Sequence, residues 1–83
     1  MSSKNLISEL LSCYREKVKE WNISGLAPVS LELYNVNVVN NDITLVLLIT
    51  SPYKLHDLIS ICDYFSVSLD KCTINREMLR LTL

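Results

Sequence analysis

The chain has 83 residues, which is enough for one small domain with a single hydrophobic core. Hydrophobic residues form 49% of it and charged residues 20%, with one glycine and two prolines, a composition that excludes a disordered segment. The formal net charge is -1, without the basic surplus that binding to a nucleic-acid backbone requires. We therefore expect one folded domain, residues 1–83, that does not bind nucleic acid.

The first predicted element is an amphipathic helix between about Asn5 and Asn22. Apolar residues recur there at helical spacing, and charged residues fill the other face. Ser2 or Ser3 is expected to cap the start of the helix, and Gly25 lies just past its end, where helices commonly terminate. The apolar positions are Leu6, Ile7, Leu10, Leu11, Tyr14, Val18 and Trp21.

A strand is predicted over residues 29–38, where apolar and polar residues alternate. The alternation slips by one position between Leu33 and Tyr34, which predicts a β-bulge or a bend. Residues 40–42, Asn-Asn-Asp, are typical of a tight turn. A second strand over residues 43–50 then completes a hairpin. This strand is apolar on both faces, which is typical of the centre of a sheet.

A second helix is expected to open at Ser51-Pro52, with Ser51 as N-cap and Pro52 at the first helical position. Residues 67–74 and 78–83 are predicted to be the third and fourth strands, joined by a turn at residues 75–77. The inward stripe of the second helix is expected to consist of Leu55, Leu58, Ile59, Cys62 and Phe65.

The predicted element order is therefore α-β-β-α-β-β. Two helices and two hairpins in this order pack most simply as two helices on one face of a four-stranded antiparallel sheet. This is an α+β fold, a ferredoxin-like plait permuted so that its first strand comes last. The composition of the strands favours the order 1-2-4-3, with 2-1-3-4 left open. The expected core is Leu10, Tyr14, Val18, Leu45, Leu47, Leu58, Cys62, Leu79 and Leu81.

Groups for catalysis or cofactor binding are sparse. His56 is the only histidine, which excludes a histidine-based triad or a multi-histidine metal site within one chain, and it is expected to be solvated. Asp57 and Asp63 are both expected to face outward, and six positions apart on a helix they do not face each other. One glycine cannot build a glycine-rich phosphate loop. We therefore expect no enzyme activity, no cofactor and no metal.

The three cysteines lack the close spacing of a metal knuckle or a redox motif. Cys13 and Cys62 fall within predicted helices, where a free cysteine behaves as a small hydrophobic residue. We expect free thiols, with one Cys62–Cys72 disulfide as the main alternative.

Protein contacts are the remaining use for the surface. A single-layer plait leaves the back of its sheet uncovered and the first strand as a free edge, and an apolar surface there invites a partner. RNA recognition on such a sheet uses aromatic residues of central strands, and Tyr34, the one aromatic strand residue, lies on an edge. For Tyr14 and Trp21, which lie on the first predicted helix, packing into the core is the alternative to a role in the interface. The candidate interface residues are Tyr14, Trp21, Tyr34, Val36, Val38, Val46 and Leu48.

One further pattern runs through the second half of the chain. It consists of Val46-Leu47-Leu48-Ile49 before Ser51-Pro52-Tyr53, then Leu55, Leu58-Ile59, Tyr64-Phe65 and Val67, and the closing Leu79-Arg80-Leu81-Thr82-Leu83. With the element order, this pattern resembles the C-terminal periplasmic domain of the PilO and GspM families, over nearly the whole chain. These are inner-membrane assembly-platform proteins of type IV pili and type II secretion systems.

The resemblance implies a non-catalytic domain that forms a homodimer, or a heterodimer with a paralogous ferredoxin-like domain of the GspL or PilN type. It also implies a place on the periplasmic side of the bacterial inner membrane, as part of a longer anchored protein. Any anchor must lie outside this sequence, because the longest apolar run, residues 45–49, is too short to span a membrane. Whether Met1 is the native start stays open.

A second hypothesis comes from a different class of protein. A ferredoxin-like domain of this size can be a small regulatory or ligand-binding domain, such as a metabolite sensor or a phage-encoded inhibitor. A cluster of buried polar side chains in a pocket would favour this alternative, as would a native start at Met1.

Overall fold

The computed structural model describes residues 3–25 and 27–83, and it confirms the predicted element order. The four strands form one antiparallel sheet in the order β1-β2-β4-β3, which confirms the favoured order over 2-1-3-4. The elements are α1 (Ser3–Ile23), β1 (Leu31–Val39), β2 (Asp42–Ile49), α2 (Leu55–Tyr64), the 3₁₀ turn η1 (Leu69–Lys71), β3 (Cys72–Asn75) and β4 (Met78–Thr82).

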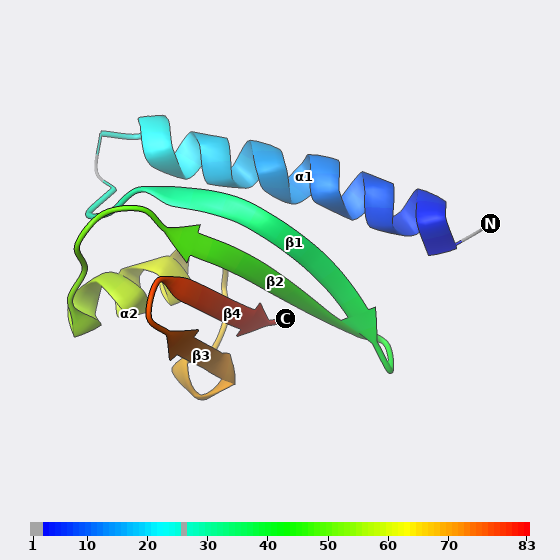
Figure 1. Cartoon of the computed structure of the whole chain (residues 1–83). Helices are drawn as coiled ribbons and strands as arrows, with labels where there is room; N and C mark the ends of the chain where they lie inside the picture. Colours follow the sequence, from blue (N-terminus) through cyan, green and yellow to red (C-terminus); the bar gives the residue numbers. More distant parts are fainter. Residues whose placement is uncertain (1–2, 26) are drawn as a thin grey trace.

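Both helices contribute to one hydrophobic core on one face of the sheet. α1 supplies Val18 and Trp21, and α2 supplies buried residues to the same cluster. The Tyr64 hydroxyl donates a hydrogen bond of 3.0 Å to the Lys17 carbonyl, which ties the two helices together. The predicted core is confirmed, with Leu10 and Tyr14 half-buried at its border. Figure 1 shows α1 running beside β1, with its first turns at the same end of the molecule as the β1–β2 turn.

The end of α1 lies where the sequence predicts it. The amide and the hydroxyl of Ser24 both donate to the Trp21 carbonyl, at 3.3 and 2.9 Å. Gly25 follows with a φ of 76°, a left-handed conformation that glycine adopts without strain. At the other end, Ser3 lies inside the helix, so it is not the predicted cap, and Ser2 lies outside the described residues.

The first hairpin follows its predicted turn and its predicted bulge. Asn40 and Asn41 form a two-residue turn with φ values of 50° and 68°, the left-handed pair that a type I′ hairpin turn needs. The pairing of β1 with β2 shifts between Leu33 and Asn35, which leaves Tyr34 as the extra residue. The bulge lets Leu33 and Val36 both face the helices although they are three positions apart.

The second helix begins three residues later than the predicted first helical position. Its N-cap is Lys54, so the prediction of Ser51 and Pro52 as its opening residues is wrong. The Ser51 hydroxyl instead accepts a hydrogen bond of 3.0 Å from the Ser30 amide, just before β1. A tertiary contact therefore takes the oxygen that the sequence pattern assigns to a helix cap.

The later start of α2 is accompanied by a different inward stripe. Asp57, predicted to face outward, is buried because its carboxylate serves the helix start. Leu55 and Ile59, predicted to face inward, are exposed, and Ile61 takes a core position. The observed stripe is Leu58, Ile61, Cys62 and Phe65.

The third strand is shorter than predicted. The alternation over residues 67–74 suggests a strand throughout, but only Cys72–Asn75 pairs with β4. Ser66 has a φ of 57°, and the Lys71 amide donates to the Ser68 carbonyl at 2.9 Å, closing the 3₁₀ turn η1. Val67 is buried in the core without belonging to a strand. The edge formed by β3, with four residues, is therefore less than half as long as the edge formed by β1, with nine.

Candidate interaction surface

The predicted interface residues differ in how much of them a partner could reach. Tyr34 is 63% exposed and Val38 is 37% exposed, both on β1. Tyr14 and Leu48 are half-buried. The prediction is corrected for the remaining three residues, which are buried within the single chain: Trp21, Val36 and Val46.

Each of these three residues is buried for its own reason. Trp21 faces the sheet and donates a hydrogen bond of 2.8 Å to the Val29 carbonyl. Val36 lies beyond the bulge, which turns it toward the helices. Val46 is on the back of the sheet but pairs with Asn35 on one side and Arg80 on the other, and it is 4% exposed.

The back of the sheet is not the apolar surface that the second strand suggested. Strand alternation places Leu48 and Met78 there beside Val46, and both are half-buried. The neighbouring strands add mostly polar side chains to this face, so it has no broad apolar patch. Those polar residues are Glu32, Asn35, Asn37, Thr73, Asn75, Arg80 and Thr82, and β2 itself adds Thr44.

The free edge of β1 is covered at its first residue. The Leu31 amide donates to the Asn22 side-chain oxygen at 2.9 Å, and the Asn22 side-chain amide donates to the Leu31 carbonyl at 2.7 Å. Asn22 thus occupies the position that a neighbouring strand would take. Further along, the Val36 amide donates to the Asn35 side chain at 2.9 Å, which satisfies a second edge group. These two asparagines restrict strand pairing along the first half of the edge.

The backbone of Val38 faces away from the sheet. The Leu83 amide donates a hydrogen bond of 2.8 Å to the Ile43 carbonyl. The backbone groups of Ile43 therefore point toward β4. The next residue, Thr44, must therefore direct its groups toward β1, where it pairs with Asn37. One position beyond Asn37, the amide and carbonyl of Val38 point outward. The end of β1 thus offers backbone groups that another strand could bind.

Apolar side chains accompany these outward backbone groups. Val39 is 60% exposed, and with Tyr34 and Val38 it forms what we call the β1 edge surface. Residues 33–39 carry no charge, so two such edges can approach each other without repulsion. Val39 is missing from the predicted interface. The sequence does contain a signal for an exposed valine here. Adjacent residues of a strand face opposite sides, so one of Val38 and Val39 faces away from the helices.

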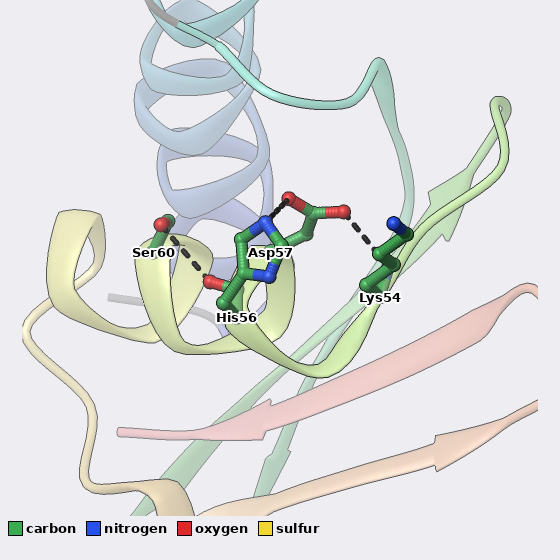
Figure 2. A network of polar contacts seen from close by, with 4 residues as sticks. All are labelled: Lys54, His56, Asp57 and Ser60. Atoms are coloured by element: carbon green, nitrogen blue, oxygen red, sulfur yellow. Dashed lines mark hydrogen bonds and ion pairs between the residues drawn. The ribbon is translucent and has the colours of Figure 1, made fainter.

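The polar cluster at the start of α2 is a helix cap (Figure 2). One Asp57 carboxylate oxygen accepts from the Lys54 amide at 2.8 Å, and the other lies 3.3 Å from His56 Nε2. The Ser60 hydroxyl donates to the His56 carbonyl at 3.0 Å and does not bond to the imidazole. The three side chains therefore do not form the serine–histidine–carboxylate relay of a hydrolase. His56 is exposed, as predicted.

Two open hollows on the surface are large enough to admit a small ligand. The larger, about 560 Å³, lies where the chain leaves β2, beside the turn between β3 and β4, and Tyr53 and Arg76 line it. The other, about 470 Å³, lies between α1 and β1, with Lys19 and Glu32 among its lining residues. Within residues 3–25 and 27–83, no buried side-chain polar atom lacks a hydrogen-bond partner, and no group of three histidine, cysteine or acidic residues could hold a metal. The described residues thus offer no specific observation in favour of a ligand site.

Burial shifts the ionisation of several groups around the core. It raises the pKa of Tyr14, with a smaller contribution from nearby Cys13, and it raises the pKa of Tyr64, with a smaller contribution from Glu20. Burial also raises the pKa of the Cys72 thiol from 9.0 to about 12, and a hydrogen bond with the Cys62 thiol adds to this shift. All three groups are therefore neutral in the folded domain at physiological pH.

We expect the free energy of unfolding to fall as the pH rises above 9.0. The Cys72 thiol ionises near 9.0 when unfolded but stays protonated to about 12 when folded, so deprotonation favours the unfolded chain. Its contribution is complete below pH 9.0 and is lost progressively up to about 12. The loss stays below ~1.4 kcal/mol per pH unit because solvent reaches the half-buried thiol. Urea unfolding between about pH 8 and 11 measures it, and a Cys72→Ser chain with an equally steep decline would contradict the prediction.

Comparison with known proteins identifies no relative of this chain. No family model matches the chain, and searches of curated proteins and of solved structures return no match. Among the helices in the described part of the chain, neither is long and apolar enough to cross a membrane.

Proposed function

We propose that this chain is a non-catalytic protein–protein interaction and dimerisation domain. The β1 edge surface carries the proposal, because exposed apolar side chains and outward backbone groups occur together there. An added strand would pair its main chain with Val38 and cover Tyr34 and Val39. The opposite edge, β3, has only four residues and offers much less length for pairing.

For the biological setting, we propose the periplasmic side of a type II secretion or type IV pilus inner-membrane assembly platform. The support is the resemblance of the chain to the C-terminal domains of the PilO and GspM families. It covers nearly the whole chain in element order, with the apolar pattern of residues 46–67 and 79–83. In this setting the partner is a second copy or a paralogous ferredoxin-like domain of the GspL or PilN type. The domain would belong to a longer anchored protein.

We expect the isolated chain to sediment as a dimer at tens of micromolar. Val38→Lys should weaken the dimer at least about tenfold, because association would bury the lysine charge beside an apolar edge. The matched control is Ile74→Lys, since Ile74 is also 37% exposed, on the same face of the sheet and on the opposite edge strand. This control should leave the dimer unchanged. Circular dichroism of both variants confirms that they remain folded.

A second variant tests pairing through the backbone. Val38→Pro removes an outward amide and leaves the hydrogen bonds between β1 and β2 in place, so it should also weaken the dimer, whereas Val38→Ala should weaken it less. If Ile74→Lys dissociates the dimer and Val38→Lys does not, the β1 edge is the wrong surface. If the wild type is a monomer, the homodimer is wrong, and co-purification with a GspL- or PilN-type domain tests the heterodimer.

A further inference from the structure

Two of the three cysteines lie together although ten positions separate them. Cys62 is in the last turn of α2 and is buried in the core, and Cys72 is the first residue of β3 and packs against that core. Cys72 pairs with the buried Leu81, which places its side chain on the helix-facing side of the sheet with Cys62, and the two thiols interact there. All three cysteines are free thiols, and Cys13 is exposed on α1. The Cys62 and Cys72 sulfur atoms are therefore neighbours, as a disulfide requires.

The backbone holds both residues of this pair in place. After α2, the Val67 amide donates to the Cys62 carbonyl at 2.9 Å, so the chain turns back over the end of the helix. The turn η1 then leads into β3, where Cys72 pairs with Leu81 of β4. The helix end and the strand start are thus fixed on both sides of the two thiols. A bond between them would join two elements that the fold already holds in place.

We propose that Cys62 and Cys72 form a dithiol site that a small disulfide oxidant, such as oxidised glutathione, closes to an intrachain disulfide. Cys72 is the half-buried member and therefore the one that the oxidant reaches. The small fraction of Cys72 that is ionised, which grows as the solution becomes alkaline, attacks the oxidant, forms a mixed disulfide and releases one glutathione thiolate. The buried Cys62 thiolate then attacks the Cys72 sulfur and releases the second. Two cysteine thiols are oxidised, one oxidised glutathione is reduced to two glutathione thiols, and the thiol protons pass to the released thiolates through solvent.

The site is independent of the proposed dimerisation. The bridge forms within one chain and ties α2 to β3, at the opposite edge of the sheet from β1. It would be populated in a compartment that oxidises thiols and open in one that reduces them. The closed form holds the segment between the two cysteines as a short loop and restricts the unfolded chain.

Tryptic mapping tests the proposal. The protein used is the folded 83-residue chain in which Cys13 is replaced by serine, Cys13→Ser. Cleavage after Lys54, Lys71 and Arg76 places the two cysteines in separate peptides, 55–71 and 72–76. After incubation with oxidised glutathione we expect these peptides to be joined, and dithiothreitol should separate them. The matched control, Cys13→Ser with Cys72→Ser, should give no joined peptide. Separate glutathione adducts, or an unmodified Cys62 beside a glutathionylated Cys72, would overturn the proposal.

Thermal unfolding provides a second measurement. Closure should raise the Tm by about 10 °C, because the bridge removes conformational freedom mainly from the unfolded chain. The rise should be absent in the control chain treated in the same way. A lower Tm after closure would mean that the bond strains the native arrangement, and this too would overturn the site. Neither readout depends on whether the chain dimerises.

Discussion

Replacing Leu47 with alanine is expected to lower the free energy of unfolding by about 2–5 kcal/mol. Leu47 is 0% exposed in the central strand β2, and it pairs with Leu33 on one side and Leu79 on the other. Close packing on every side leaves little room for the surroundings to collapse, so truncation leaves a cavity. For a domain of this size the loss is a large part of the total stability. Equilibrium urea unfolding followed by circular dichroism measures it.

The neighbouring residue on the same strand provides the control. Leu48 points to the other side of the sheet and is half-buried there. The same truncation, Leu48→Ala, should therefore cost about 1 kcal/mol or less. Equal losses at the two positions would show that the back of the sheet is packed as tightly as the core, contrary to the arrangement described.

Trp21→Ala should be about as damaging, at roughly 3–5 kcal/mol. The indole is buried, donates to the Val29 carbonyl and contacts the Tyr64 ring edge-on, with ring centres 5.2 Å apart. Truncation removes a large apolar side chain at the junction of α1, α2 and the start of β1. Urea unfolding must be followed by far-UV circular dichroism, because the variant lacks the only tryptophan.

A conservative variant separates the hydrogen bond from the packing. Trp21→Phe keeps an aromatic ring but leaves the buried Val29 carbonyl without its donor, which should cost about 1–3 kcal/mol. Truncation of an exposed aromatic residue, Tyr34→Ala, should change the stability by no more than about 0.5 kcal/mol when it is measured at a concentration low enough for the chain to be monomeric. A similar loss for Tyr34→Ala and Trp21→Ala would contradict the assignment of Trp21 to the core.

The two edges of the sheet differ in how the fold protects them. Asn22 and the Tyr34 bulge hinder strand addition at the start of β1, and nothing equivalent is seen among the described residues beside Val38. β3 is instead protected by its shortness, because the 3₁₀ turn η1 takes the residues that would have extended it. We therefore expect an added strand to pair with the end of β1 at Val38, next to the β1–β2 turn.

The order of elements and the centre of the sheet follow from the sequence alone. Turn formation depends on adjacent residues, and Asn40 and Asn41 are among the few residue types that tolerate a positive φ. The bulge at Tyr34 could be predicted because a change in apolar alternation requires an extra residue. A strand as apolar as β2 is stable only where other elements cover it. These signals are local, so no knowledge of the tertiary structure was needed.

Tertiary structure alone decided which side chains are reachable. Val46 is covered by Asn35 and Arg80, which lie on different strands, and no pattern within β2 indicates that pairing. The same holds for Asn22 beside the edge of β1 and for Ser51, whose hydroxyl binds the chain before β1 and not the start of α2. The contact between the Cys62 and Cys72 thiols depends on how η1 returns the chain to the sheet. Periodicity specifies which face a residue occupies, but its exposure depends on neighbours that are distant along the chain.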